Sequence, residues 1–116
     1  MSTHLTTHVL DASRGAPARE VSIALARLHD TGEVSHLADG LTNDDGRLAL
    51  GPELLDPGTY LLTFATGAYF AAQQVETFYP LVTVSFSVAP AAHDETPHLH
   101  VPLLLSPFAY STYRDS

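Results

Sequence analysis

Two histidines near the C-terminus, His98 and His100, are the side chains best placed for chemistry in this chain of 116 residues. They stand at the start of an apolar run typical of a β-strand, and residues two apart in a strand share a face. Both imidazoles are therefore expected to point to one surface. Histidine exists in both protonation states near neutral pH, because its ordinary pKa is about 6.5, and this suits it to proton transfer in hydrolysis.

A third histidine and an arginine could complete such a site. His8 lies in a β-rich segment, residues 5–11, and Arg47 follows the turn Asn43-Asp44-Asp45-Gly46. Arginine keeps its charge and can hold the negative charge of a substrate or of an oxyanion. If the opening and closing strands are neighbours, His8 and His100 come together. Taken singly, His8 fits a half-buried strand histidine and Arg47 a solvated surface charge.

Metal sites are the main alternative use of these residues. His98 and His100, with His93 or His8 as a third ligand, would fit a zinc site, since imidazoles on one strand face can converge on a metal. The turn at 43–46 resembles a calcium loop only superficially, because the alternating ligands and the distal glutamate are missing. No serine stands in the Gly-x-Ser-x-Gly pattern of a nucleophile, so we do not expect covalent catalysis.

The elements that must position these residues are mostly strands. Alternating apolar residues and turn signals predict strands at 5–11, 20–28, 33–39, 47–50, 59–66 and 81–88, and a helix at 68–74. They also predict a final hairpin over 98–116 that turns at Leu105-Ser106-Pro107-Phe108. Short, regularly spaced strands with one short helix favour an all-β fold, a two-sheet sandwich of seven to eight strands. Within the first strand, Thr6, His8 and Leu10 share a face.

The amino-acid composition limits the kinds of partner and site that we expect. The formal net charge is -8, which disfavours nucleic acid and anionic membranes as partners. The chain has no cysteine, so it can form neither disulfides nor a cysteine-based zinc site. No apolar run approaches the roughly 18 residues of a membrane span, and we expect a cytoplasmic protein made of one domain, residues 1–116.

Four stretches together resemble a known family. Residues 5–11, 45–47, 98–104 and 111–116 read Leu-Thr-Thr-His-Val-Leu-Asp, Asp-Gly-Arg, His-Leu-His-Val-Pro-Leu-Leu and Ser-Thr-Tyr-Arg-Asp-Ser. With their spacing they resemble the transthyretin-like 5-hydroxyisourate hydrolases across nearly the whole chain. The carrier transthyretin shares the fold but lacks the histidines and the Tyr-Arg-x-Ser ending, so the sequence is more similar to the enzyme branch.

The resemblance implies both an assembly and a reaction. It implies a transthyretin-like (prealbumin) β-sandwich that forms a homotetramer, a dimer of dimers, with active sites at the mouths of a central channel. It implies hydrolysis of 5-hydroxyisourate to 2-oxo-4-hydroxy-4-carboxy-5-ureidoimidazoline in urate catabolism, without cofactor or metal. His8, Arg47 and His100 match the catalytic positions, where they would assist attack of water on a cyclic amide carbonyl.

Substrate binding is expected from the residues around that set. They are His98, Tyr113, Arg114 and Ser116, the last three in the segment that closes the site. Asp115 stands where the family usually has glycine and adds a carboxylate near an anionic substrate. A non-catalytic carrier of small planar ligands is the alternative function.

Overall fold

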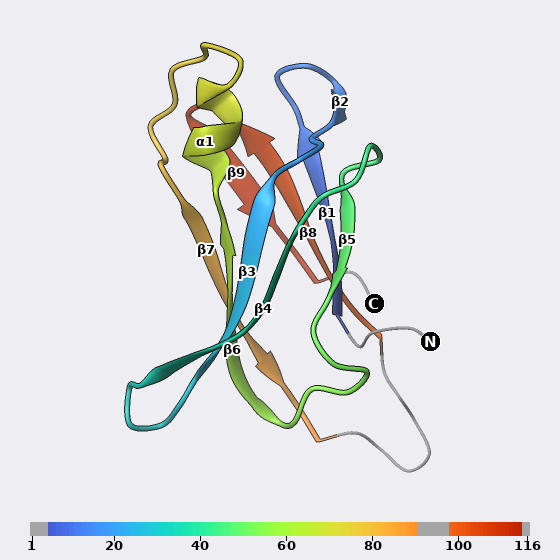
Figure 1. Cartoon of the computed structure of the whole chain (residues 1–116), viewed down its shortest axis with the longest axis vertical. Coiled ribbons are helices and arrows are strands. Elements are labelled where there is room, and N and C mark those ends of the chain that lie inside the picture. Colours follow the sequence, from blue (N-terminus) through green and yellow to red (C-terminus); the bar gives the residue numbers. More distant parts are fainter. Residues whose placement is uncertain (1–4, 91–97, 115–116) are drawn as a thin grey trace.

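The computed structural model describes residues 5–90 and 98–114, and its strands form two sheets packed face to face (Figure 1). One sheet has the order β2-β1-β8-β9, with β5 also paired to β1, and the other has the order β4-β3-β6-β7. The elements are β1 Leu5–Asp11, β2 Ala16–Pro17, β3 Ser22–Leu28, β4 Val34–Leu41, β5 Arg47–Leu50, β6 Gly58–Phe64, α1 Thr66–Ala71, β7 Val82–Val88, β8 Leu99–Ser106 and β9 Ala109–Thr112. The predicted all-β sandwich is confirmed.

The predicted elements differ from the observed ones by one or two residues at several strand ends, as in β4 and β6, and more clearly in two places. Within the described residues there are nine strands, and the additional one is β2, whose Ala16 and Pro17 pair with Asp11 and Leu10. The turn-forming composition around it conceals so short a strand. The helix spans Thr66–Ala71 rather than 68–74, because Gln74 has a left-handed φ of 59° and ends the helix in a tight turn.

Strand alternation divides the first sheet into a core face and an outer face. Along β1, Leu5, Thr7, Val9 and Asp11 are buried, whereas the residues between them are only half-buried. The inward side chains of β8, β3 and β6 complete the core, and they include Leu99, Val101, Leu103, Ile23, Leu25, Leu62 and Phe64. Each fully buried side chain of this size contributes roughly 1.5–3 kcal/mol. Thr6 and His8 of β1 are thereby held on the outer face, as predicted.

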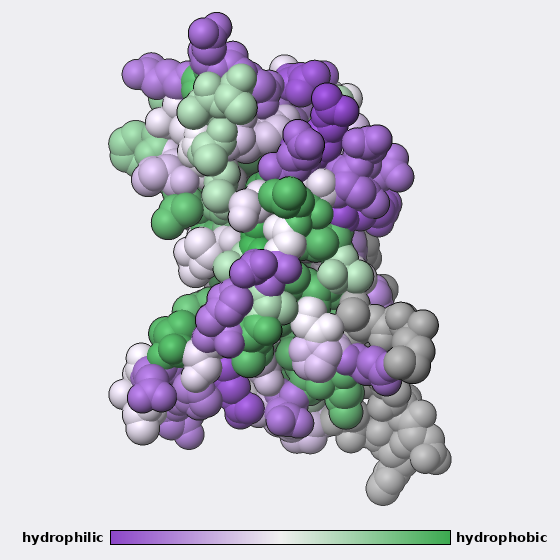
Figure 2. Space-filling view, viewed as in Figure 1, coloured by the Kyte–Doolittle hydropathy of each residue, from purple (hydrophilic) through white to green (hydrophobic). Residues whose placement is uncertain are grey.

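The surface seen from the direction of Figure 1 has both hydrophobic and hydrophilic regions. Hydrophobic residues gather around the middle of the molecule, and hydrophilic residues cover much of the end that holds β2 and α1 (Figure 2). No helix among the described residues is both long enough and apolar enough to cross a membrane.

A buried carboxylate ties α1 to β1. Asp11 is 1% exposed, and its Oδ2 accepts a hydrogen bond of 2.7 Å from the Tyr69 hydroxyl. Its Oδ1 accepts from the backbone N–H and the hydroxyl of Ser13. Burial, followed by the hydrogen bond to Asp11, raises the pKa of Tyr69. The first strand and the helix are therefore joined by a charged hydrogen bond inside the sandwich.

We expect Tyr69→Phe to lower the free energy of unfolding by about 1.5–3 kcal/mol at neutral pH, because a hydrogen bond to a charged group is lost. A raised tyrosine pKa stabilises the fold below the ordinary pKa, and this contribution is lost as the pH rises through the folded-state pKa. The difference between wild type and variant should therefore shrink above about pH 10. Urea unfolding at several pH values measures it, with exposed Tyr113→Phe as the control. Equal stability of Tyr69→Phe and wild type would contradict the role of the bond.

Candidate active site

Strand register brings the predicted catalytic residues to one face. β1 lies between β5 and β8, with His8 directly opposite Arg47 on antiparallel β5 and Thr6 directly opposite His100 on parallel β8. Directly opposite residues share a face, with Cβ atoms about 4.5–5.5 Å apart in antiparallel pairs. The predicted adjacency of the opening and closing strands is confirmed, since β1 and β8 lie side by side (Figure 1). This pairing gathers the side chains on the outer face of the first sheet.

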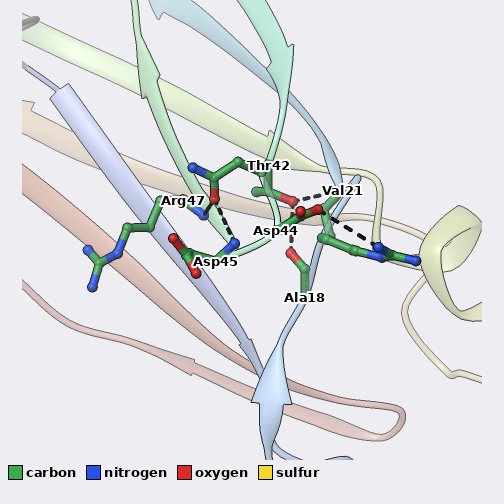
Figure 3. A network of polar contacts seen from close by, with 8 residues as sticks. Ala18, Val21, Thr42, Asp44, Asp45 and Arg47 are labelled. Carbon is green, nitrogen blue, oxygen red and sulfur yellow. Dashed lines mark hydrogen bonds and ion pairs between the residues drawn. The ribbon is translucent and has the colours of Figure 1, made fainter.

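The turn before β5 fixes the backbone position of Arg47. The Oδ1 atom of Asn43 accepts the backbone N–H groups of Asp45 at 2.9 Å and of Arg47 at 3.0 Å (Figure 3). Gly46 has a φ of 75°, and any Cβ there would collide with the carbonyl oxygen of Val9. Strand β1 contacts this turn through a hydrogen bond of 2.8 Å from the Val9 N–H to the Gly46 carbonyl. The Arg47 side chain extends away from this network (Figure 3).

The other side of the turn is anchored in the core. The hydroxyl of Thr42, a buried residue, donates to the Ala18 carbonyl at 2.8 Å and accepts the Val21 N–H at 2.9 Å (Figure 3). An ion pair of 3.8 Å between Arg19 and Asp44 is exposed, and such pairs contribute about 0–1 kcal/mol. The Thr42 hydroxyl is therefore a stronger anchor than the ion pair, and the hydrogen-bonded turn sets the position of the Arg47 backbone.

The tautomer of neutral His8 follows from its contact. Its Nε2 atom lies 2.8 Å from the backbone carbonyl oxygen of Asp45. A carbonyl oxygen only accepts hydrogen bonds, so His8 must carry a proton on Nε2 and donate it. In the neutral ring the lone pair is therefore on Nδ1.

Thr6 joins the two C-terminal histidines. Its hydroxyl oxygen lies 2.9 Å from His98 Nε2 and 2.8 Å from His100 Nδ1. The two rings are stacked, with centroids 6.4 Å apart and planes 15° apart. A hydroxyl has one proton and two lone pairs, so Thr6 can donate to one imidazole and accept from the other, or accept an N–H from both.

These side chains border an open hollow of about 800 Å³, which lies in the usual range for small-molecule sites. Its lining includes Thr6, His8, Leu41, Asn43, Arg47, His98, His100, Pro102 and Tyr113. Among the described residues that line it, Arg47 carries a permanent positive charge and none carries a carboxylate. Although the chain has a net charge of -8, the lining of this hollow suits a small anion.

The predicted site residues divide into three groups. Five line the hollow: His8, Arg47, His98, His100 and Tyr113. Arg114 instead lines an adjoining hollow of about 290 Å³, which it shares with His100 and Tyr113. Three residues singled out in the sequence lie outside the described residues: His93, Asp115 and Ser116.

The zinc alternative gains no support from the described residues. Within 5–90 and 98–114, no three side chains of histidine, cysteine, aspartate or glutamate are arranged to hold a metal ion. His98 and His100 instead contact the Thr6 hydroxyl.

Thr6 and Asn43 are site residues that the sequence did not single out. Thr6 shares the outer face with His8, but its place between His98 and His100 follows only from the register of β1 against β8. Asn43 begins a recognisable turn, yet its bond to the backbone of Arg47 spans four residues. An asparagine that opens an Asp-Gly turn just before a candidate arginine is the signal that could have identified it.

Comparisons with known proteins identify the family of this chain. The model of the HIUase/Transthyretin family matches residues 5–115. A 5-hydroxyisourate hydrolase of Mus musculus is 44% identical over 118 residues, which covers 99% of this chain and 97% of that protein. The structure of Klebsiella pneumoniae 5-hydroxyisourate hydrolase has a TM-score of 0.83 and 38% identity, with all of both chains covered. Sea bream transthyretin, solved in complex with thyroxine, has a TM-score of 0.87 and 30% identity, covering 97% of this chain and 94% of that one. The chain therefore belongs to the HIUase/Transthyretin family.

Proposed function

We propose that this protein is a 5-hydroxyisourate hydrolase that opens a cyclic amide in urate catabolism. Water adds to the carbonyl carbon, the ring C–N bond breaks, and the leaving nitrogen takes a proton to give 2-oxo-4-hydroxy-4-carboxy-5-ureidoimidazoline. The observation that carries the proposal is the convergence of His8, Arg47 and His100 on one hollow. The hydrolases of Mus musculus and Klebsiella pneumoniae, similar over nearly their whole length, support it.

The three residues divide the work by their chemistry. One of His8 and His100 removes a proton from water, and the other orients the water or delivers a proton to the leaving nitrogen. Arg47 binds the anionic substrate and stabilises the tetrahedral oxyanion with its planar set of donors. No step of this scheme needs a metal or another cofactor.

The surrounding residues bind the substrate in this proposal. His98 and Tyr113 border the same hollow, and Arg114 lies beside Tyr113 at the adjoining one. Ser116, which lies outside the described residues, is proposed to bind the substrate with them. Asp115, in the same segment, adds a negative charge that Asp115→Gly would remove.

The carrier reading is the second candidate, because sea bream transthyretin has been solved with a bound ligand. Binding a planar molecule does not require two histidines and an arginine on one face. The residues that line this hollow therefore favour a catalytic function over a carrier function.

A turnover assay distinguishes the hydrolase function from the carrier function. 5-Hydroxyisourate is generated from urate by urate oxidase, and its ultraviolet decay is followed with and without the protein at neutral pH, with a chelator present. We expect a decay rate that rises in proportion to protein concentration. A decay rate unchanged by the protein would contradict the proposed function.

We also propose that the chain assembles as a homotetramer, a dimer of dimers. β9 lies at the edge of its sheet with all four residues exposed, and Phe108, Tyr110 and Leu104 present apolar surface around it. Unpaired edge strands and clustered apolar side chains are the usual features of a surface that another chain covers. Light scattering should give four times the chain mass of 12.4 kDa, and a monomer mass would contradict the assembly.

Residues 1–116 are proposed as one domain in the cytoplasm. Both described sheets contribute to one hydrophobic core, and a fold without cysteine suits a reducing compartment.

A further inference from the structure

We propose that Thr6 is a positioning residue that links His98 and His100 into a proton relay, in which His100 is the base that acts on water. This inference rests on the proposed hydrolase function and goes beyond it by assigning the base. It also gives His98 a second task besides contact with substrate.

Two of the arrangements open to this bridge couple the rings when both are neutral, because in each of them Thr6 donates to one ring and accepts from the other. In the first, His100 donates its Nδ1–H to the Thr6 oxygen, and Thr6 donates its proton to His98 Nε2. His100 Nε2 then carries the lone pair and can act as a base. In the second, both bonds reverse, and His100 Nε2 carries a proton that it can give away. Thr6 therefore couples the tautomers of two rings that are not bonded to each other.

The first arrangement can accept a proton from water with every atom accounted for. His100 Nε2 takes the proton while the water oxygen bonds to the carbonyl carbon. The Nδ1 proton of His100 passes to the Thr6 oxygen, and the Thr6 hydroxyl proton passes to His98 Nε2. His100 ends neutral with its proton on Nε2, His98 ends as the cation, and the negative charge is on the tetrahedral intermediate.

The same relay runs backwards when the intermediate collapses. His100 Nε2 gives its proton to the leaving nitrogen, while His98 returns its proton to Thr6 and Thr6 returns one to His100 Nδ1. The first arrangement is restored at the end of the cycle. One ring thus serves as base and then as acid.

The location of the two rings favours this direction of charge movement. His100 is half-buried on β8, whereas His98 is exposed. Burial disfavours the charged form of a histidine, so a cation is more stable on the ring that water reaches. Passing the proton through Thr6 moves the positive charge from the half-buried ring to the exposed one.

The contact of His8 makes it less suited to the same task. Its Nε2–H donates to the backbone carbonyl of Asp45, which cannot pass a proton onward. His8 is therefore held in one neutral tautomer. That arrangement suits a ring that orients water or substrate, and it leaves the cycling base to His100.

Thr6→Val tests the relay, because it removes the hydroxyl while keeping a β-branched side chain that suits a strand. We expect kcat to fall by about 100-fold with KM little changed, which is the lower end of the range for proton-transfer groups. Thr6→Ser keeps a hydroxyl and should restore most of kcat. Thr63→Val is the matched control, since Thr63 pairs with Thr83 at an exposed position of the other sheet. An unchanged kcat in a folded Thr6→Val protein would overturn the relay.

The resting protein gives a second readout that needs no substrate. Nitrogen-15 NMR at a pH where both rings are neutral should show His98 and His100 each protonated on Nδ1 in the wild type. In Thr6→Val at least one ring should lose this preference, and in Thr63→Val both should keep it. Identical tautomers in wild type and Thr6→Val would overturn the coupling. Normal turnover with no effect of Thr6→Val contradicts only the relay, whereas coupled tautomers without turnover contradict only the hydrolase function.

Discussion

Replacing His100 by asparagine lowers kcat/KM for 5-hydroxyisourate hydrolysis by about 10²–10⁴-fold, the loss expected when a general acid–base group is removed. Asparagine can still bond to Thr6, but it cannot take a proton from water. His100 is half-buried on the outer face of its sheet rather than in the core, so we expect the fold to be retained. Stopped-flow ultraviolet decay measures the rate, and circular dichroism checks the fold.

The matched control for this variant is His36→Asn. His36 is an exposed histidine of β4 in the other sheet, and it pairs with Asp39 at 3.1 Å. Its substitution should leave turnover unchanged. A His100→Asn enzyme that retained wild-type turnover would contradict the assigned role, and release of a bound metal by this variant would support the zinc reading instead.

Replacing Arg47 by glutamine lowers kcat by about 10²–10³-fold, the typical cost of removing one group that stabilises an oxyanion. The Asn43 turn holds the backbone of residue 47 through the N–H group, so this contact survives the substitution. Arg47→Lys should recover part of the rate, because lysine keeps the charge but lacks the planar set of donors.

Arg19→Gln provides the control for charge alone. Arg19 lies near the same turn, pairs with Asp44 and has a side chain 69% exposed, so its loss should leave kcat unchanged. If Arg47→Gln raised KM without lowering kcat, Arg47 would bind substrate and transition state equally, and its role in stabilising the oxyanion would be contradicted.

The sequence was sufficient to predict most of the strands and the outer-face position of His8. Apolar alternation places Leu5 and Val9 in the core, and the same alternation places His8 on the outer face. The glycine of the Asp45-Gly46 turn indicates the positive φ that this turn requires. These features are local, and local sequence determines them.

Features that depend on strand pairing could not be predicted in the same way. The bridge from Thr6 to His100 joins residues far apart in the chain, and it exists because β1 and β8 pair in parallel with Thr6 opposite His100. A shift of one residue would turn Thr6 into the core. Strand β2 could not be predicted either, since its two residues show no alternation. The end of the helix could not be predicted because it depends on the backbone conformation of Gln74.

Counting turnovers gives the most direct test of the hydrolase function. Carbon-13 urate is oxidised in large molar excess over the protein, with a chelator present, and the carboxylate of the ring-opened product is followed by NMR. We predict that many equivalents of product form per protein chain, faster than in the same mixture without the protein. Product formation at the spontaneous rate, or retention of one bound equivalent without conversion, would contradict the assignment and favour a carrier.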